Sequence, residues 1–299
     1  MATLYTQQGS NIRKTWFLMA MFLVLVMAIG YGVSWYLNSP IILYIAVAFA
    51  VGMNIFSYWH SDKIVLRMTN AKPVSREEHR ELWNITENLA ITAGLPMPKL
   101  YIVEEPAPNA FATGRNPEHG VVAVTTGLLD ILDKNELEGV VAHEMAHIGN
   151  RDILVMTVAV VLAGFIAILA DFFMRSMMFG GDNRDRHPAF LILAIVGIIL
   201  APIAAQLIQM AVSRKREYLA DASGALLTRY PEGLASALQK ISGYTGPMKS
   251  ASHATAHLFI DDPFDNGHQK QGLMKSIGNL FQTHPPVQNR IAELRQMNI

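Results

Sequence analysis

The chain has 299 residues, of which 51% are hydrophobic and 16% are charged, and this apolar composition excludes an intrinsically disordered protein. Basic and acidic residues both number 24, so the net charge of zero gives no indication of a nucleic-acid partner. Cysteine is absent, which excludes disulfides, cysteine nucleophiles and thiolate metal sites, so any metal must be bound by histidine and carboxylate groups.

The first apolar region carries no Asp, Glu, Lys or Arg between residues 15 and 61. Residues 38–40 (Asn-Ser-Pro) interrupt it and predict a tight turn. The two halves, residues 15–37 and 41–59, are each long enough to cross a hydrocarbon core of about 30 Å. We therefore predict a transmembrane hairpin as the first domain, residues 1–60. A cleaved signal peptide is the alternative, but its apolar region would be shorter and no second span would follow at once.

A polar block at residues 61–152 has the signals of an α+β domain. Ser75 with Glu78 forms a capping box that predicts the start of a helix, and Gly94 predicts its end. Short β-prone runs bounded by Pro, Gly and Asn follow at residues 99–103 and 121–125.

The helix that follows carries the chemistry. Asp133 with Glu136 signals its start, and it contains the pattern H-E-x-x-H. On a helix, His143 and His147 lie on one face, near enough for both imidazoles to reach one zinc ion. Glu144 lies beside that face, where its carboxylate can take a proton from the attacking water instead of binding metal. The pattern also arises by chance in a chain with ten histidines, but its place inside a capped helix favours the zinc interpretation.

A second apolar pair follows that helix. Residues 153–170 are uncharged, and the run extends to residue 174 past a single aspartate. Residues 188–213 are also uncharged and contain one proline, which a membrane helix tolerates as a kink. We predict a second transmembrane hairpin, residues 153–212; a buried hairpin of a large soluble core is the alternative.

Basic residues near the span ends predict the orientation. The turn at residues 38–40 has none, whereas the loop at residues 175–188 has three arginines diluted by two aspartates. We expect both termini and both polar blocks, residues 61–152 and 213–299, to lie in the cytoplasm. The basic residues at the predicted cytoplasmic ends are Arg13, Lys14, Lys63, Arg67, Arg151, Arg214, Lys215 and Arg216.

A catalytic zinc bound by two histidines needs a third protein ligand and an open position. Glu217 is the best candidate, because Asp221 lies four residues later and can accept the second ring N–H of a ligating histidine. The alternative is that both carboxylates belong to a solvated helix face. Two predicted spans separate His147 from Glu217, and an even number of crossings returns the chain to the same side. His253 and His257 form a rival pair, without a glutamate after the first histidine.

The last block, residues 213–299, contains three predicted segments. The helix of the fourth span continues to Leu227, and residues 244–283, rich in Gly, Ser, Asp and His, are expected to form a long mobile loop. A short helix follows Pro285-Pro286, and three of its side chains are expected to face inward: Val287, Ile291 and Leu294.

Several ordered motifs resemble the HtpX-type integral membrane zinc metalloproteases, relatives of the eukaryotic CAAX prenyl proteases. The resemblance covers roughly residues 96–222 and 283–295. The motifs are NAFATG (109–114), VVAVTTGLL (121–129), HEMAH (143–147), RKREYLAD (214–221) and HPP (284–286) with Arg290. The implied fold is a mainly α membrane protein with four transmembrane helices in two hairpins and a small α+β zincin-like catalytic domain.

The resemblance implies a gluzincin-like endopeptidase of the bacterial plasma (inner) membrane, linked to heat shock. It would degrade misfolded or damaged membrane proteins at the cytoplasmic face, within membrane lipid, and self-cleavage is expected as a side reaction. The implied roles are one Zn²⁺ per chain on His143, His147 and Glu217, with Glu144 as general base and Asp221 behind a ligand. Asn109, His284 and Arg290 are implied to contact the substrate backbone or the developing oxyanion.

We further expect an extended substrate to add to an edge strand at residues 121–125, against Val121 and Val124, with Asn109 holding its backbone. Two alternatives differ in function: a protease for prenylated or small peptides, and a membrane scaffold that uses zinc only to join two helices. Glu144 argues against the scaffold, because a structural zinc site needs no base.

Overall fold

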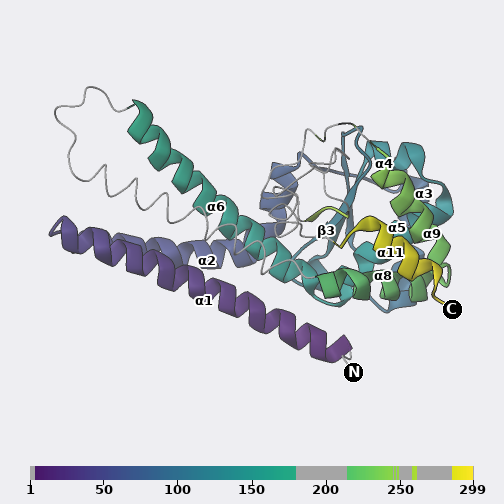
Figure 1. The fold of residues 1–299 in the computed structure, drawn as a ribbon, viewed down its shortest axis with the longest axis horizontal. Helices are drawn as coiled ribbons and strands as arrows, with labels where there is room; N and C mark the ends of the chain where they lie inside the picture. Colours follow the sequence, from purple (N-terminus) through teal and green to yellow (C-terminus); the bar gives the residue numbers. More distant parts are fainter. Residues whose placement is uncertain are drawn as a thin grey trace, which may run out of the picture.

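Long helices form one end of the computed structural model, and a domain built around a small sheet forms the other (Figure 1). The structure describes residues 4–179, 214–244, 246, 248, 258–260 and 285–298. Most of the predicted loop at residues 244–283 and the whole predicted fourth span at residues 188–213 lie outside the described residues, as do His253 and His257. The layout of four membrane helices in two hairpins therefore stays a prediction beyond its first hairpin.

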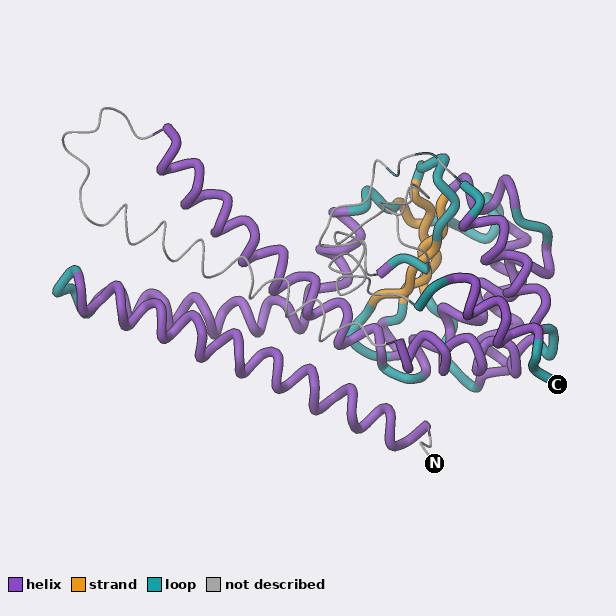
Figure 2. Tube along the Cα trace, viewed as in Figure 1, coloured by secondary structure: helices purple, strands orange, loops and turns teal. Residues whose placement is uncertain are grey.

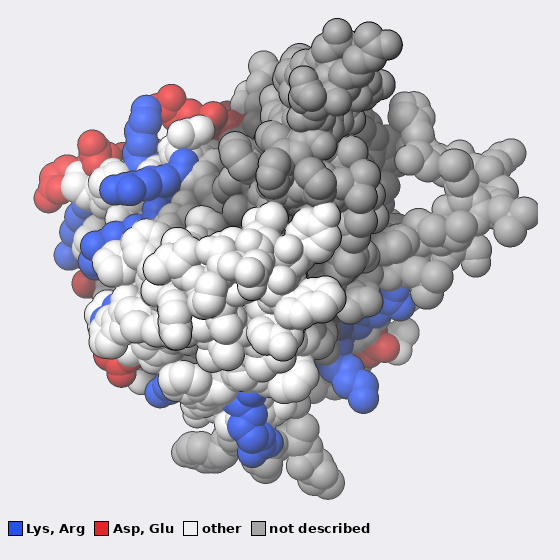
Figure 3. All heavy atoms as spheres, turned by 90° about the vertical axis from the view of Figure 1, so that its left-hand side faces the viewer, with Lys and Arg blue, Asp and Glu red and all other residues white. Residues whose placement is uncertain are grey.

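The predicted N-terminal hairpin is present as two helices, α1 (Leu4–Tyr36) and α2 (Ile41–Met68). Asn38 adopts the left-handed conformation (φ 49°) in the turn between them. By length and composition, Gln8–Tyr36 and Ile41–Met68 can each cross a membrane. Figure 3 shows the hairpin from its turn end, where the exposed face carries no charged side chain and Lys, Arg, Asp and Glu lie around the rim.

Aromatic side chains mark both ends of this hairpin. Trp16 of α1 stacks on Tyr58 of α2 at 6.3 Å, and both Trp16 and Trp35 are largely exposed. Trp16 and Trp35 are about 29 Å apart along the helix at 1.5 Å per residue, which matches the thickness of a hydrocarbon core. Exposed tryptophans at this spacing are typical of the two interfaces of a membrane.

A third long helix, α6 (Asp152–Phe179), packs against α1 and α2 and contains the predicted third span. Its apolar contacts include Val158 and Leu162 against Leu18 and Phe22 of α1. α6 leaves the preceding helix α5 at an angle of 83°, and α5 together with residues 152–166 has the length and composition of one membrane span broken by a sharp bend. The bend lies at Arg151, which has a left-handed backbone (φ 58°).

The sheet has four strands in the order β1-β2-β4-β3, with β2 and β4 parallel and the outer pairs antiparallel. Strands β2 (Lys99–Val103) and β4 (Val121–Thr125) confirm the two predicted strands, whereas β1 (Lys72–Pro73) and β3 (Ala110–Thr113) were not predicted. The prediction that residues 121–125 form an edge strand is wrong, because β3 pairs along the whole of β4.

The edge position belongs to β3, and part of its outer side already has a partner. Phe259 forms an antiparallel bridge with Phe111, and the N–H of Ile260 donates to the carbonyl of Ala110 at 3.0 Å. Residues 258–260 are thus packed on the strand that a peptide could otherwise extend.

The remaining helices complete the domain. The Asp133 capping box is confirmed. The Asp133 side chain accepts from the backbone N–H of Glu136, and the Glu136 side chain accepts from the backbone N–H of Asp133. The predicted start at Ser75 is wrong: Ser75 and Glu78 bond to each other in a turn, and the helix begins only after His79, whose backbone is not helical. The helices are α3 (Arg80–Ala93), the short 3-10 helix (Pro117–His119), α4 (Thr126–Ile131), α5 (Lys134–Gly149), α8 (Arg214–Thr228), α9 (Pro231–Ser242) and α11 (Val287–Arg295).

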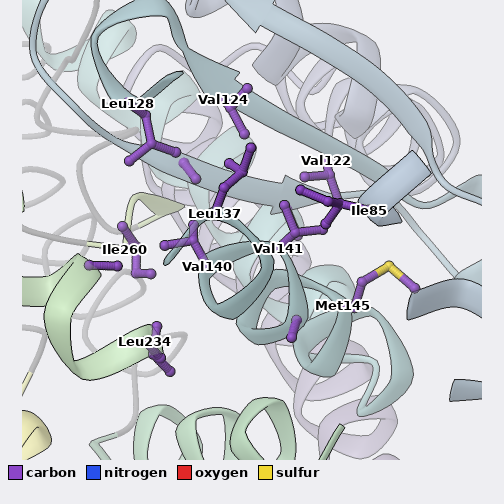
Figure 4. Close-up of a cluster of buried hydrophobic side chains, with 14 of the residues drawn as sticks. Ile85, Val122, Val124, Leu128, Leu137, Val140, Val141, Met145, Leu234 and Ile260 are labelled. Atoms are coloured by element: carbon purple, nitrogen blue, oxygen red, sulfur yellow. The ribbon is translucent and has the colours of Figure 1, made fainter. Parts of the chain in front are cut away.

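Both faces of the sheet are covered, and Figure 2 shows the strands packed beside the helices of the domain. Val122 and Val124 face the core around α5, where they meet Val141 and Met145 (Figure 4). Alternate residues of β4 point the other way, so that Val121 packs with the ends of α2 and α6. Helix α5 with its H-E-x-x-H pattern is therefore fixed against one face of the sheet, and the ends of α2 and α6 cover the other face.

Close backbone contact between α5 and α9 depends on Gly139. A Cβ at this position would lie 2.6 Å from the backbone nitrogen of Leu234 and 2.9 Å from its Cα. Helix α9, which was not predicted, begins at Pro231 and buries Leu234, Leu238 and Ile241. Only a residue without a side chain lets these helices approach so closely.

We predict that Gly139→Ala lowers stability by about 1–3 kcal/mol, because overpacking forces two backbones apart. The matched control is Gly149→Ala in the same helix, where a Cβ would meet only the Leu95 side chain at 3.4 Å. Thermal unfolding in detergent, followed by circular dichroism, should show a lower midpoint for the first variant only. Equal midpoints for both variants would contradict this packing.

Candidate metal centre

The two histidines of H-E-x-x-H face each other from successive turns of α5. Their Nε2 atoms lie 3.2 Å apart, and the side chains are 1% and 5% exposed for His143 and His147. This is the arrangement expected when both imidazoles bind one metal ion, because their Nε2 atoms converge while the two Nδ1 atoms point away.

Glu217 brings the third donor from α8. Its carboxylate oxygens lie 3.8 Å from Nε2 of His143 and 3.7 Å from Nε2 of His147, and the three residues form a group that could hold a metal ion. In a tetrahedral zinc site with bonds of 2.0–2.1 Å, neighbouring ligand atoms are about 3.3 Å apart. The donor set and spacing therefore fit a single zinc ion.

Charge balance supports the same fit. Four carboxylates are buried around the two imidazoles, and when all are ionised they outnumber the two buried guanidinium groups by two negative charges. With both imidazoles neutral, as metal binding requires, a divalent cation would neutralise this excess, whereas burying uncompensated charge is costly. The carboxylates are those of Glu144, Asp152, Glu217 and Asp221, and the guanidinium groups are those of Arg216 and Arg290.

Gly224 allows α8 to lie against α5 at the level of the histidines. A Cβ there would lie 3.0 Å from the backbone nitrogen of His143. Glu217 and Asp221 are consequently buried, at 3% and 2% exposure, and they do not form the solvated helix face considered as the alternative.

Asp221 holds the far side of His143. Its Oδ1 lies 2.9 Å from Nδ1 of His143, and Arg290 donates to both of its oxygens at 2.7 and 2.8 Å. Burial opposes the charged form of Asp221, but the Arg290 charge and hydrogen bonds outweigh it and lower the pKa to about 2. Burial also lowers the pKa of His143. A neutral imidazole with a fixed tautomer is what metal binding requires.

Asp152 plays the matching part for His147, a role that was not predicted from the sequence. Its Oδ2 lies 3.1 Å from Nδ1 of His147, across the bend between α5 and α6. Burial opposes the charged form of His147, but the hydrogen bond that its Nδ1–H donates to Asp152 and the negative charges of Glu217 and Asp152 raise its pKa to about 9. The aspartate five residues after His147 was a visible signal, although its relevance depends on the bend.

Glu144 is buried beside the metal group. Burial is the largest cause that raises the pKa of Glu144, to about 7. A carboxylate with a pKa near neutrality can both accept and return a proton at physiological pH.

The other predicted residues are placed differently. Arg290 is fully buried and directs its donors at Asp221 and the carbonyl of Ile260. Asn109 is buried at the start of β3, where its backbone N–H donates to the hydroxyl of Thr125. Val121 and Val124 are buried on opposite faces of the inner strand β4, which does not fit contact with a substrate. His284 lies outside the described residues.

Comparison with known proteins identifies the family. A model of Peptidase family M48 matches residues 76–298. A protease HtpX homolog of Caldanaerobacter subterraneus subsp. tengcongensis is 47% identical over 306 residues, covering 99% of both chains. The homolog of Pyrococcus furiosus is 49% identical over 286 residues, covering 95% of both. A crystal structure of S. mikatae Ste24p covers 97% of this chain and 67% of its own, at 17% identity and a TM-score of 0.49.

The chain belongs to peptidase family M48. It is therefore a metallopeptidase, and its two apolar helices together with the near full-length HtpX relatives indicate an integral membrane protein. In this M48 peptidase, the group formed by His143, His147 and Glu217 is the place where a metal ion fits.

We predict that Arg290→Leu destabilises this M48 peptidase by about 3–5 kcal/mol, because Asp221 would be left as a buried charge without its partner. Arg295→Leu on the same helix is the matched control: its exposed pair with Glu232 should matter little. Apparent unfolding midpoints in detergent compare the two, and a similar loss in both variants would refute a special role for the buried pair.

Proposed function

We propose that this protein is a zinc endopeptidase that cleaves unfolded or damaged membrane proteins at the cytoplasmic surface of the plasma membrane, as part of protein quality control under stress. The observation that carries the proposal is the convergence of His143, His147 and Glu217, with Glu144 beside them, near the end of the membrane hairpin that carries Trp16 and Tyr58. Its mechanism follows from how each side chain is held.

Zinc, when bound, supplies a Lewis acid that polarises the scissile carbonyl and promotes ionisation of water. Glu144 takes the proton from the attacking water and passes it to the departing amine. Asp221 and Asp152 each hold one imidazole by its Nδ1, so both Nε2 atoms keep their direction during turnover.

The position of the site relative to the hairpin supports action at the membrane surface. Asn11 lies about 7.5 Å beyond Trp16 along α1 and contacts Asp152, which in turn contacts His147. Basic residues gather at this end of the hairpin, whereas the turn at residues 38–40 has none, which favours a cytoplasmic location. The basic residues are Arg13, Lys14, Lys63 and Arg67.

Burial of the donors supports an unfolded substrate. The three candidate ligands are at most 5% exposed, so a peptide bond inside a folded domain could not reach them. A segment that has lost its structure can extend into the site, and the same reasoning applies to self-cleavage by a second copy of the chain.

We predict that Glu144→Gln retains about one zinc ion per chain but lowers the rate of peptide hydrolysis by about 10²–10⁴-fold, because the general base is lost while the ligands remain. Glu138→Gln, six residues earlier on α5 and outside the site, is the matched control. Zinc content by atomic absorption and cleavage of an unfolded membrane protein provide the measurements.

Two outcomes would count against the proposal. Cleavage by the Glu144→Gln protein at the wild-type rate would refute the mechanism, and faster cleavage of a prenylated tetrapeptide tail than of the unfolded membrane protein would move the substrate class to prenylated peptides. The same membrane protein in its folded form should be cleaved more slowly than its unfolded form.

Absence of cysteine makes the orientation directly testable. We predict that a single cysteine at Ser39, in the α1–α2 turn, reacts with a membrane-impermeant maleimide added outside spheroplasts, whereas one at the exposed Glu77 reacts only after lysis. The reverse pattern would place the catalytic domain on the outer side.

A further inference from the structure

The first membrane helix reaches the candidate metal centre through one buried side chain. Asn11 of α1 is 0% exposed, and its Nδ2 donates to Oδ1 of Asp152 at 2.6 Å. The same amide nitrogen donates to the backbone carbonyl of Asn150 at 3.1 Å. Both hydrogens of the amide are therefore directed at the bend between α5 and α6.

The two carboxylate oxygens of Asp152 have different partners. Oδ2 lies 3.1 Å from Nδ1 of His147, whereas Oδ1 accepts from Asn11 and lies 3.5 Å from Nε of Arg216. A carboxylate that is held at one oxygen cannot rotate freely about its Cβ–Cγ bond. The donors on Oδ1 thus determine where Oδ2 points.

Without the Asn11 contact, the bend alone would not fix the position of Asp152 relative to His147. Asp152 is the first residue of α6, directly after Arg151 with its left-handed backbone. The side chain that orients His147 therefore stands on a helix that turns by 83° away from the helix of His147. The Asn11 amide bonds to both sides of this bend, at Asn150 and Asp152, and joins them to α1.

Among the side chains that the structure describes, which end at Ile166 in α6, the contacts between α1 and α6 beyond this point form an apolar cluster and give little directional information. Asn11 supplies the directional contact, in the way that single polar side chains set the register of packed helices. Gln8, one turn earlier, also reaches the bend, but its side chain donates to the carbonyl of Gly149 at 2.7 Å and not to Asp152.

We propose that Asn11 is a positioning residue of the metal centre: through Asp152 it fixes the direction of the His147 imidazole, so that the N-terminal membrane helix is part of the metal site. The inference rests on the proposed function only in taking zinc as the metal held by the histidines. It assigns to α1 a role beyond anchoring the chain in lipid.

The test measures zinc affinity of the full-length protein in detergent, by competition with a chromophoric chelator. Asn11→Leu should weaken zinc binding by about 10–100-fold, the usual effect of losing an outer contact of a metal site. Gln8→Leu is the matched control and should change the affinity by less than about threefold. Asn11→Asp, which keeps the side-chain shape but removes both donated hydrogens, provides a second variant if the leucine does not fold.

A double-mutant cycle separates positioning from general destabilisation. If Asn11 acts through Asp152, Asn11→Leu should add little to the loss already caused by Asp152→Asn. Visible absorption of the Co²⁺-loaded proteins should change for Asn11→Leu and stay as in the wild type for Gln8→Leu. Tryptophan fluorescence of the metal-free variants checks that each is folded.

Unchanged zinc affinity in both folded Asn11 variants, or fully additive losses in the cycle, would overturn the inference. A wild-type protein that binds no zinc would instead contradict the proposed function, so the two failures are distinguishable. A weaker Gln8→Leu variant, equal to Asn11→Leu, would also overturn it, since the effect would then come from helix packing in general.

Discussion

Two carboxylate–imidazole hydrogen bonds define the direction of the histidines, and the rest of the site depends on them. Each histidine offers a metal only one nitrogen, and that nitrogen is well aimed only when the opposite one is held. Asp221 holds His143 from α8, and Asp152 holds His147 from the start of α6. Because these two carboxylates come from different helices, the orientation of both imidazole rings depends on how α6 and α8 pack against α5.

The buried charges explain why so many helices meet at this point. Each carboxylate that orients or binds must be compensated in a region from which water is excluded. Arg290 compensates the charge of Asp221, and Arg216 lies beside Asp152. The two arginines come from α11 and α8, so the C-terminal helix is required for the charge balance although it carries none of the three candidate ligands.

Local sequence signals predicted those groups of site residues that each lie within a single helix. The spacing of His143 and His147, the capping box and the pair Glu217–Asp221 all follow from helical periodicity. The order of the strands does not follow from periodicity. β4 is an inner strand because it also pairs with β3, and residues 110–113 were recognised only as part of a motif and not as a strand. The partnership of Asp152 depends on a bend at a non-glycine residue with positive φ. Asn11 is joined to it across 141 positions of the chain, a distance over which no periodicity carries information.

The contact between α1 and the α5–α6 bend bears on how the enzyme can be handled outside the cell. The stretch that matches the family model begins at residue 76, so a soluble fragment cut to that boundary would lack Asn11 together with the whole first hairpin. Stripping lipid with a harsh detergent could likewise separate α1 from α6 while the globular part stays folded. Preparations that look intact by their secondary structure would then differ in how firmly they retain a bound metal ion.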